Sequence, residues 1–272
     1  MKNEVFNGQR FWSYFKYDFT QMWRNHVKAS IGIGLSGLIV YVIVVAFNLI
    51  FQGTWSGASL GLRMGTFVLA GTALELYQTR TYGYLTDKRK GSAWLMNPAS
   101  TFEKWLSMIL MTIIVLPVLF LGVYLIADLL VTAFDPTTGH SILHSVGTGF
   151  RDLASQLSDV NMDYETNWNI WAFAPSFICG FITNFLFFLL CGLIFKKNKI
   201  LGGFVIIFLA SSLFSVMLSV FGLPYHVQVE LEDFAQAEAY IRHVLNITTW
   251  VSAFIAAGLA GGIYWRLKTL KH

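Results

Sequence analysis

The chain has 272 residues and a net charge of +4, with 55% hydrophobic and 12% charged residues. About a quarter of the residues of a soluble domain are charged, so composition and a mean hydropathy of +0.57 place most of this chain in a bilayer. The basic residues gather beside the ends of apolar segments, where anionic lipid and membrane orientation account for them. No nucleic-acid partner is therefore expected.

Residues 1–28 are predicted to form an interfacial elbow segment. They are polar and aromatic and lack the short apolar core and cleavage site of a removable signal peptide, so the first span is expected to act as a signal anchor. Aromatic and apolar residues recur there at helical spacing: Phe11, Trp12, Phe15, Phe19, Met22 and Trp23. This pattern predicts a helix in the cytoplasmic head-group layer. The alternative is a soluble helix packed on a cytosolic partner.

Residues 29–272 are predicted to form an all-α transmembrane domain. Six apolar segments run through it, at about 29–51, 60–77, 106–133, 169–195, 200–222 and 247–265. Each has roughly the 20 residues that a helix needs to cross about 30 Å of hydrocarbon.

Alternation of the loops predicts the orientation. With six spans, 16 of the 19 Lys and Arg residues fall on one side of the membrane. The three exceptions are Arg63, Arg151 and Arg242. The positive-inside rule then makes both termini cytoplasmic, as expected for a multi-pass protein of a bacterial inner membrane.

Glycines four residues apart mark two segments. Gly57, Gly61 and Gly65 follow Gly53 in the first hairpin, and Gly258 and Gly262 repeat the spacing in the last span. Such glycines let helices approach closely in lipid, so we expect them to serve helix packing.

The cytoplasmic loop 78–105 contains a predicted amphipathic helix. Pro98 can open that helix, Asn97 can cap it, and Phe102 with Trp105 would give it an apolar side. We expect it to run across the membrane face before the third span. The alternative is a solvated linker whose basic run anchors to lipid.

Polar residues inside spans are costly and are candidates for function. Arg63 and Asp128 are predicted at similar depth near the outer boundary, where an ion pair would stabilise both. Glu75 lies about one turn from the cytoplasmic end of its span, near Arg80 or head-group water. Asn184 is expected to form a hydrogen bond between helices.

Two outer loops are predicted to be acidic. Loop 134–168 is long, with a turn at 135–139 and a possible short helix at 150–157, and loop 223–246 is expected to form one or two short helices. By contrast, the loop 196–199 is short and makes a tight cytoplasmic hairpin.

No catalytic constellation is found, so the chain is not expected to be an enzyme. Zinc-protease, nucleophile-elbow and phosphate-loop motifs are missing. His140 and His144 have i, i+4 spacing, but no third ligand stands at a suggestive distance, so we expect no metal site. Cys179 and Cys191 lie in one span about 120° apart and are expected to be free thiols.

The layout resembles the membrane subunit of an ABC transporter of the type 2 exporter class. Residues 95–106, LMNPASTFEKWL, are similar to the stretch before the third span in ABC permease-like proteins of Bacteroidetes. Architecture matches over the whole chain, but residue-level likeness covers about twenty positions. One departure is the outer loop 134–168, which is longer than the family's usual connection.

The resemblance implies a coupling helix that docks on a separate ATPase subunit. Its residues would be Asn97, Pro98, Ala99, Ser100, Phe102, Glu103 and Lys104. ATP and Mg would bind in that partner, none in this chain. Two permease subunits, as a homodimer or a heterodimer, would rock between inward-facing and outward-facing states to export a substrate.

Two other functions are compatible with the sequence. One is a non-transporting membrane protein for interaction, assembly, immunity or resistance, which would bind a ligand at the outer loops. The other is a membrane-embedded enzyme acting on lipid, which would need His, Asp or Glu at matching depth on several spans.

Overall fold

The computed structural model describes residues 6–86, 91, 94, 96–145, 148, 174–220 and 234–270. Every regular element in these ranges is a helix, as the sequence predicts. The chain divides into two compact units, Met1–Thr81 with Pro98–Trp168 and Tyr82–Asn97 with Asn169–His272. Each unit is described by itself.

Several helices of the described ranges meet the length and composition needed to cross a membrane. Three do so alone, Thr101–Phe134, Ala174–Ile194 and Arg242–Thr269, and a fourth candidate is the pair Gly8–Gly34 and Ser36–Gln52, bent by 41°. Helices occupy all six predicted places, yet α3 (Leu60–Thr81) carries Arg63 and Glu75 and is not among the candidates. The count of six spans stays a prediction.

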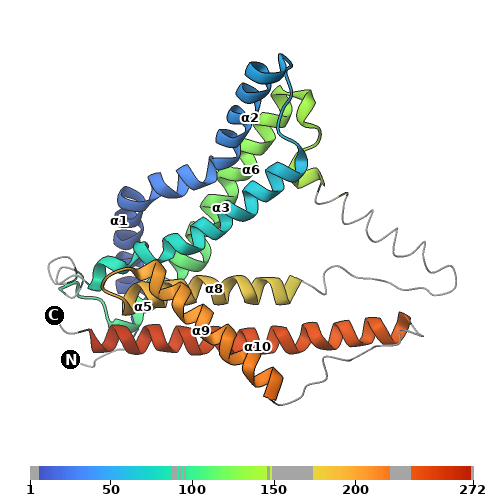
Figure 1. The fold of residues 1–272 in the computed structure, drawn as a ribbon. Helices are drawn as coiled ribbons and strands as arrows, with labels where there is room; N and C mark the ends of the chain where they lie inside the picture. Colours follow the sequence, from blue (N-terminus) through green and yellow to red (C-terminus); the bar gives the residue numbers. More distant parts are fainter. Residues whose placement is uncertain are drawn as a thin grey trace. The chain divides into compact units, whose positions relative to one another are not determined.

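The first unit begins with α1 (Gly8–Gly34) and α2 (Ser36–Gln52), coloured blue in Figure 1. The Asn7 side chain caps α1 by accepting hydrogen bonds from the backbone N–H groups of Gln9 and Arg10. Leu35 ends α1 and starts α2 with a ψ of 0°, which makes the bend. The elbow segment and the first predicted span are therefore two arms of one bent helix pair.

Small residues at this bend let α6 (Leu116–Phe134) approach closely. A Cβ on Gly34 would lie 2.9 Å from the Val123 side chain, and one on Gly37 would lie 3.0 Å from the Tyr124 ring. The Tyr124 ring also packs edge-on against Phe67, with ring centroids 5.1 Å apart. Glycine is thus the packing device here, although the sequence argument placed it elsewhere.

The predicted helix before the third span is not separate from that span. Helix α5 (Thr101–Leu110) continues through the π turn Met111–Val115 into α6, which makes one helix of 34 residues. The π turn comes just before Pro117, whose ring removes a backbone donor and disturbs the regular pattern. The prediction of a short helix lying across the membrane face is wrong in this respect.

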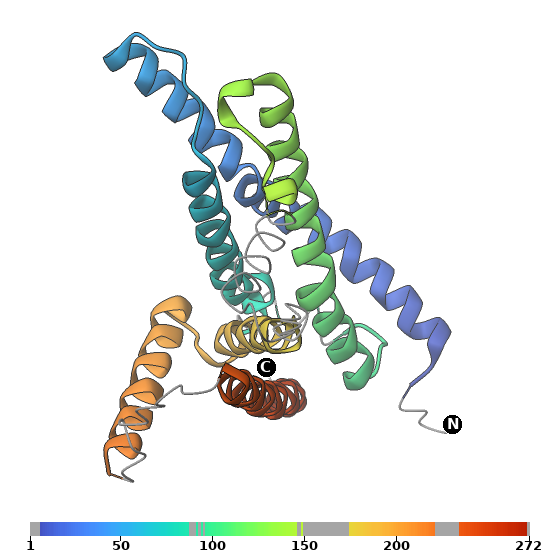
Figure 2. The same ribbon diagram turned by 90° about the vertical axis from the view of Figure 1, so that its right-hand side faces the viewer.

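The second unit contains η1 (Gly83–Thr86), α8 (Ala174–Ile194), α9 (Lys199–Val220) and α10 (Phe234–Thr269). Helices α8 and α10 lie side by side in both views (Figures 1 and 2). Thr183 Oγ1 donates to the Ser252 carbonyl at 3.1 Å, and Arg266 Nε donates to the Leu193 carbonyl at 3.2 Å. One polar contact thus joins the helices near the middle of α8, and the other joins them near its C-terminal end.

The outer segment before the last span also differs from its prediction. Residues 234–246 belong to the first part of the 36-residue helix α10 rather than to a separate short helix. The segments 149–173 and 221–233 lie outside the described residues, and the predicted helix at 150–157 falls in the first of them. The tight hairpin at 196–199 is confirmed, with Asn198 at a φ of 51° just before α9.

The predicted packing glycines behave differently from one another. A Cβ on Gly57 would overlap Thr138 Cγ2, so this residue allows a close approach between the loop 53–59 and the turn after α6. Gly61, Gly65 and Gly258 have no neighbouring atom within 4 Å of a Cβ in the described chain. Gly262 makes only an ordinary contact, 3.6 Å from Leu190.

Gly57→Ala is expected to destabilise the protein by about 1–3 kcal/mol, because the added methyl group overlaps a turn that cannot move freely. Gly61→Ala is the matched control, since the same methyl enters open space inside α3 and improves helix propensity by about 1 kcal/mol. Thermal unfolding in detergent measures both. Equal thermal unfolding midpoints for the two variants would contradict the close contact between Gly57 and the turn after α6.

Candidate functional site

The start of α5 carries a buried carboxylate that joins it to the elbow. Glu103 is 0% exposed, and its carboxylate accepts two hydrogen bonds from Arg10, Nε to Oε2 at 2.8 Å and Nη2 to Oε1 at 2.9 Å. The backbone N–H groups of Asn7 and Ser100 also donate to it, at 2.8 and 2.9 Å. Such a bidentate arginine contact fixes both distance and orientation.

Ser100 is the capping residue of α5, not Asn97. Its hydroxyl accepts from the Glu103 N–H at 3.2 Å while the Glu103 carboxylate accepts from the Ser100 N–H, a reciprocal capping box. Pro98 and Ala99 precede the cap and lie outside the helix. The N-cap of the helix thus lies three residues later in the chain than the predicted Asn97.

A second polar contact holds α1 on α5. Ser107 Oγ donates to Asp18 Oδ2 at 2.6 Å, and Asp18 is buried. Phe6 and Phe102 add an edge-on ring contact with centroids 6.1 Å apart. Asp18 therefore belongs to the face of α1 that packs on α5.

The residues predicted to couple to an ATPase therefore divide into two groups. Glu103 and Lys104 are buried, so their side chains cannot form a docking surface. Asn97, Pro98 and Ala99 are partly or fully exposed, and Met96 beside them is 83% exposed. The exposed part of the predicted coupling set is thus Asn97, Pro98 and Ala99.

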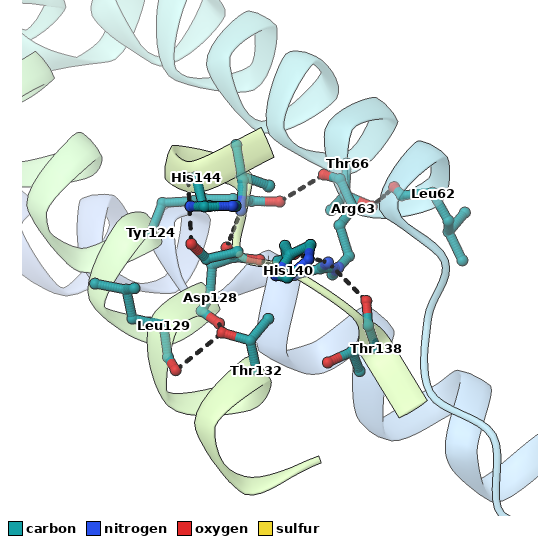
Figure 3. A network of polar contacts seen from close by, with 12 residues as sticks. Leu62, Arg63, Thr66, Tyr124, Asp128, Leu129, Thr132, Thr138, His140 and His144 are labelled. Atoms are coloured by element: carbon teal, nitrogen blue, oxygen red, sulfur yellow. Dashed lines mark hydrogen bonds and ion pairs between the residues drawn. The ribbon is translucent and has the colours of Figure 1, made fainter. Parts of the chain in front are cut away.

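The predicted ion pair between α3 and α6 is confirmed. Arg63 Nη1 lies 2.7 Å from Asp128 Oδ1, and the two residues are only 2% and 7% exposed (Figure 3). The Tyr124 hydroxyl donates to the Arg63 carbonyl at 2.9 Å and joins the same two helices. A buried charge is costly unless it is paired and hydrogen-bonded, so the two helices depend on each other here.

The ion pair also holds the chain that follows α6. Arg63 Nη2 donates to the carbonyls of Thr138 and His140, at 3.0 and 2.6 Å, and Asp128 Oδ2 accepts from the Ile142 N–H at 2.7 Å. Residues 138–142, which we call the strap, are thus fixed by both charges. The depth of the two residues in their predicted spans predicts the ion pair. It does not predict the contacts with the strap, because backbone N–H and carbonyl groups are present at nearly every residue and leave no sequence pattern.

Asp135 organises the turn before the strap. Its carboxylate accepts from the Tyr41 hydroxyl at 2.8 Å, from Trp55 Nε1 at 3.1 Å, and from the Thr137 N–H and hydroxyl at 2.9 and 2.7 Å. Burial acts to raise the pKa of Asp135, but these hydrogen bonds outweigh it and the pKa is lowered. The turn predicted at 135–139 is confirmed as η3 (Pro136–Thr138).

Two other polar candidates lie elsewhere. Glu75 is half-buried on α3, and Asn184 is exposed on α8, where it makes no hydrogen bond to another described residue. Among the described residues, Asn184 thus does not bridge two helices. Cys179 and Cys191 are free thiols, as predicted.

One lysine links two elements of the second unit. Lys199, at the start of α9, donates through Nζ to the Gly83 carbonyl and to Thr86 Oγ1, the latter at 3.0 Å. A Cβ on Gly83 would lie 2.7 Å from that Nζ. The hairpin residue Lys199 therefore fixes η1.

Comparison with known proteins gives no match to a family model, to a curated protein or to a solved structure. The described residues also contain no group of three or more His, Cys, Asp or Glu that could hold a metal ion.

Asp128→Asn is expected to destabilise the protein by about 3 kcal/mol, because it leaves the Arg63 charge buried without a counter-ion. Arg80→Gln is the control, since it removes an exposed cation at the other end of α3. Unfolding in detergent measures the loss. The double variant Arg63→Met with Asp128→Leu should recover part of it, and no difference between Asp128→Asn and Arg80→Gln would contradict a stabilising pair.

Proposed function

We propose that the chain is the permease subunit of an ATP-driven exporter in a bacterial inner membrane. In this proposal all six apolar segments span the bilayer, both termini are cytoplasmic, and a separate ATPase subunit supplies ATP and Mg. A second permease, identical or related, completes the transport path. The helices that are apolar enough to cross a membrane support the membrane location.

The observation that carries the proposal is the exposed segment 96–99 and its connection to α5. Met96 is an exposed large hydrophobic residue, and four residues later Ser100 begins a helix that runs to Phe134. An exposed methionine has a flexible side chain that can adapt to a partner's surface, which suits a contact beside a rigid helix. We assign the coupling contact to Met96, Asn97, Pro98 and Ala99.

Glu103 then has a different role from the one that the resemblance implies. It fixes the helix start and the elbow together through Ser100 and Arg10. A displacement of the segment 96–99 would therefore move α1 and α5 as one body. Phe102 contributes to the same body through its contact with Phe6.

Purification of the full chain from its native membrane is expected to recover an ATPase, identified by mass spectrometry. Met96→Ser should reduce that recovery several-fold, because it removes the exposed apolar contact. Phe134→Ser is the matched control, since Phe134 is 84% exposed and ends the helix that Thr101 begins, about 50 Å away. Recovery of no ATPase from intact complexes would reject the exporter and favour an interaction or immunity protein.

Orientation is tested separately with single cysteines in a background that has Ala at positions 179 and 191. Met96→Cys should react with a membrane-impermeant thiol reagent only in opened cells, because the basic side is cytoplasmic. Thr54→Cys, in the exposed loop between α2 and α3, should react in intact cells. Reaction of Met96→Cys from outside would reject the coupling assignment.

A further inference from the structure

Two exposed histidines lie together beside the buried ion pair. The ring centroids of His140 and His144 are 4.7 Å apart, with the rings tilted by 46°. Figure 3 shows both imidazoles next to the Arg63 and Asp128 side chains. Neither side chain is used by the exporter proposal.

The backbone that carries the two rings is fixed at three points. Arg63 holds the His140 carbonyl at 2.6 Å, and Asp128 holds the Ile142 N–H at 2.7 Å. The Ser141 hydroxyl accepts from the His144 N–H at 3.3 Å. The rings therefore project from a preorganised segment, which lowers the entropy that a shared ligand must overcome.

The ring spacing fits one metal ion between two imidazoles. With metal–nitrogen bonds of about 2.0–2.1 Å and a tetrahedral angle, two coordinated imidazoles have centroids about 5 Å apart. The observed 4.7 Å is close to that value. The i, i+4 spacing alone could not establish this, because residue 140 precedes the helical turn 142–145.

We propose that His140 and His144 bind one divalent transition-metal ion of the zinc type, with water completing its coordination. Imidazole nitrogen favours zinc, nickel and copper, whereas magnesium and calcium prefer oxygen ligands. The bound ion would lock the strap over the Arg63–Asp128 pair, since His140 belongs to the strap and His144 follows it. The site is independent of the exporter proposal.

The test uses full-length protein in detergent, purified through a tag without histidine and titrated calorimetrically with zinc chloride. Wild-type protein should bind one zinc ion per chain at this site. His140→Gln and His144→Gln should each weaken that binding by at least about tenfold, because the loss of a direct metal ligand costs no less than the loss of a residue that supports one. His243→Gln is the matched control, an exposed histidine on α10 that should leave the affinity unchanged.

Two further measurements keep the outcome decisive. Zinc should protect His140 and His144, but not His243, from diethyl pyrocarbonate in the wild-type protein. Magnesium at the same concentration should protect none of them. Undiminished zinc affinity in His140→Gln or His144→Gln, or equal modification with and without zinc, would overturn the proposal.

Discussion

The first unit depends on one buried ion pair. Arg63 and Asp128 sit in surroundings where either charge alone would be costly, so α3, α6 and the strap are stable only when assembled together. This explains how α3, interrupted by charged and small residues, holds its place beside more apolar helices. Its position comes from directed polar contacts, including the Tyr124 hydroxyl on the Arg63 carbonyl.

The helix Thr101–Phe134 carries charged contacts at both ends. Near its start Glu103 holds the elbow through Arg10, and near its end Asp128 holds α3. Between them Ser107 and Tyr124 donate hydrogen bonds to α1 and α3, and Gly34 and Gly37 allow close packing on α6. Directed contacts at the ends and close packing in the middle make this helix the element to which α1, α2 and α3 are all fixed.

Sequence reasoning succeeded where the free-energy cost of burying an unpaired charge is enough to predict a contact. Two opposite charges at similar depth in apolar segments must meet, so the pair of Arg63 and Asp128 could be predicted from position. It failed at the start of α5, where two residues could cap the helix. Ser100 and Glu103 carry the Ser-x-x-Glu signature of a capping box, but Asn97 and Pro98 also have the residue types of a helix start.

The spacing of glycines and the polarity of elbow residues also do not by themselves predict where helices make contact. Gly61 and Gly65 have the spacing of a packing motif, but close approach occurs at Gly34, Gly37 and Gly57, because bends and loops decide where backbones meet. Likewise Asp18 is a charged residue among the aromatic residues of the elbow, yet it is buried, because Ser107 donates a hydrogen bond to it. The spacing of residues along one helix identifies its faces, but the neighbouring helix or loop determines which face is buried.

The burial of Glu103 limits how force could reach the transmembrane helices in the proposed exporter. A partner that covers Met96 cannot contact the buried Glu103 carboxylate. In the proposed exporter, motion would therefore pass along the backbone through Ser100 into the first turn of α5. Four hydrogen bonds converge on Glu103 at that turn, and two of them come from Arg10 of the elbow. Any push that turns α5 must therefore also turn α1, which makes the elbow part of the moving body.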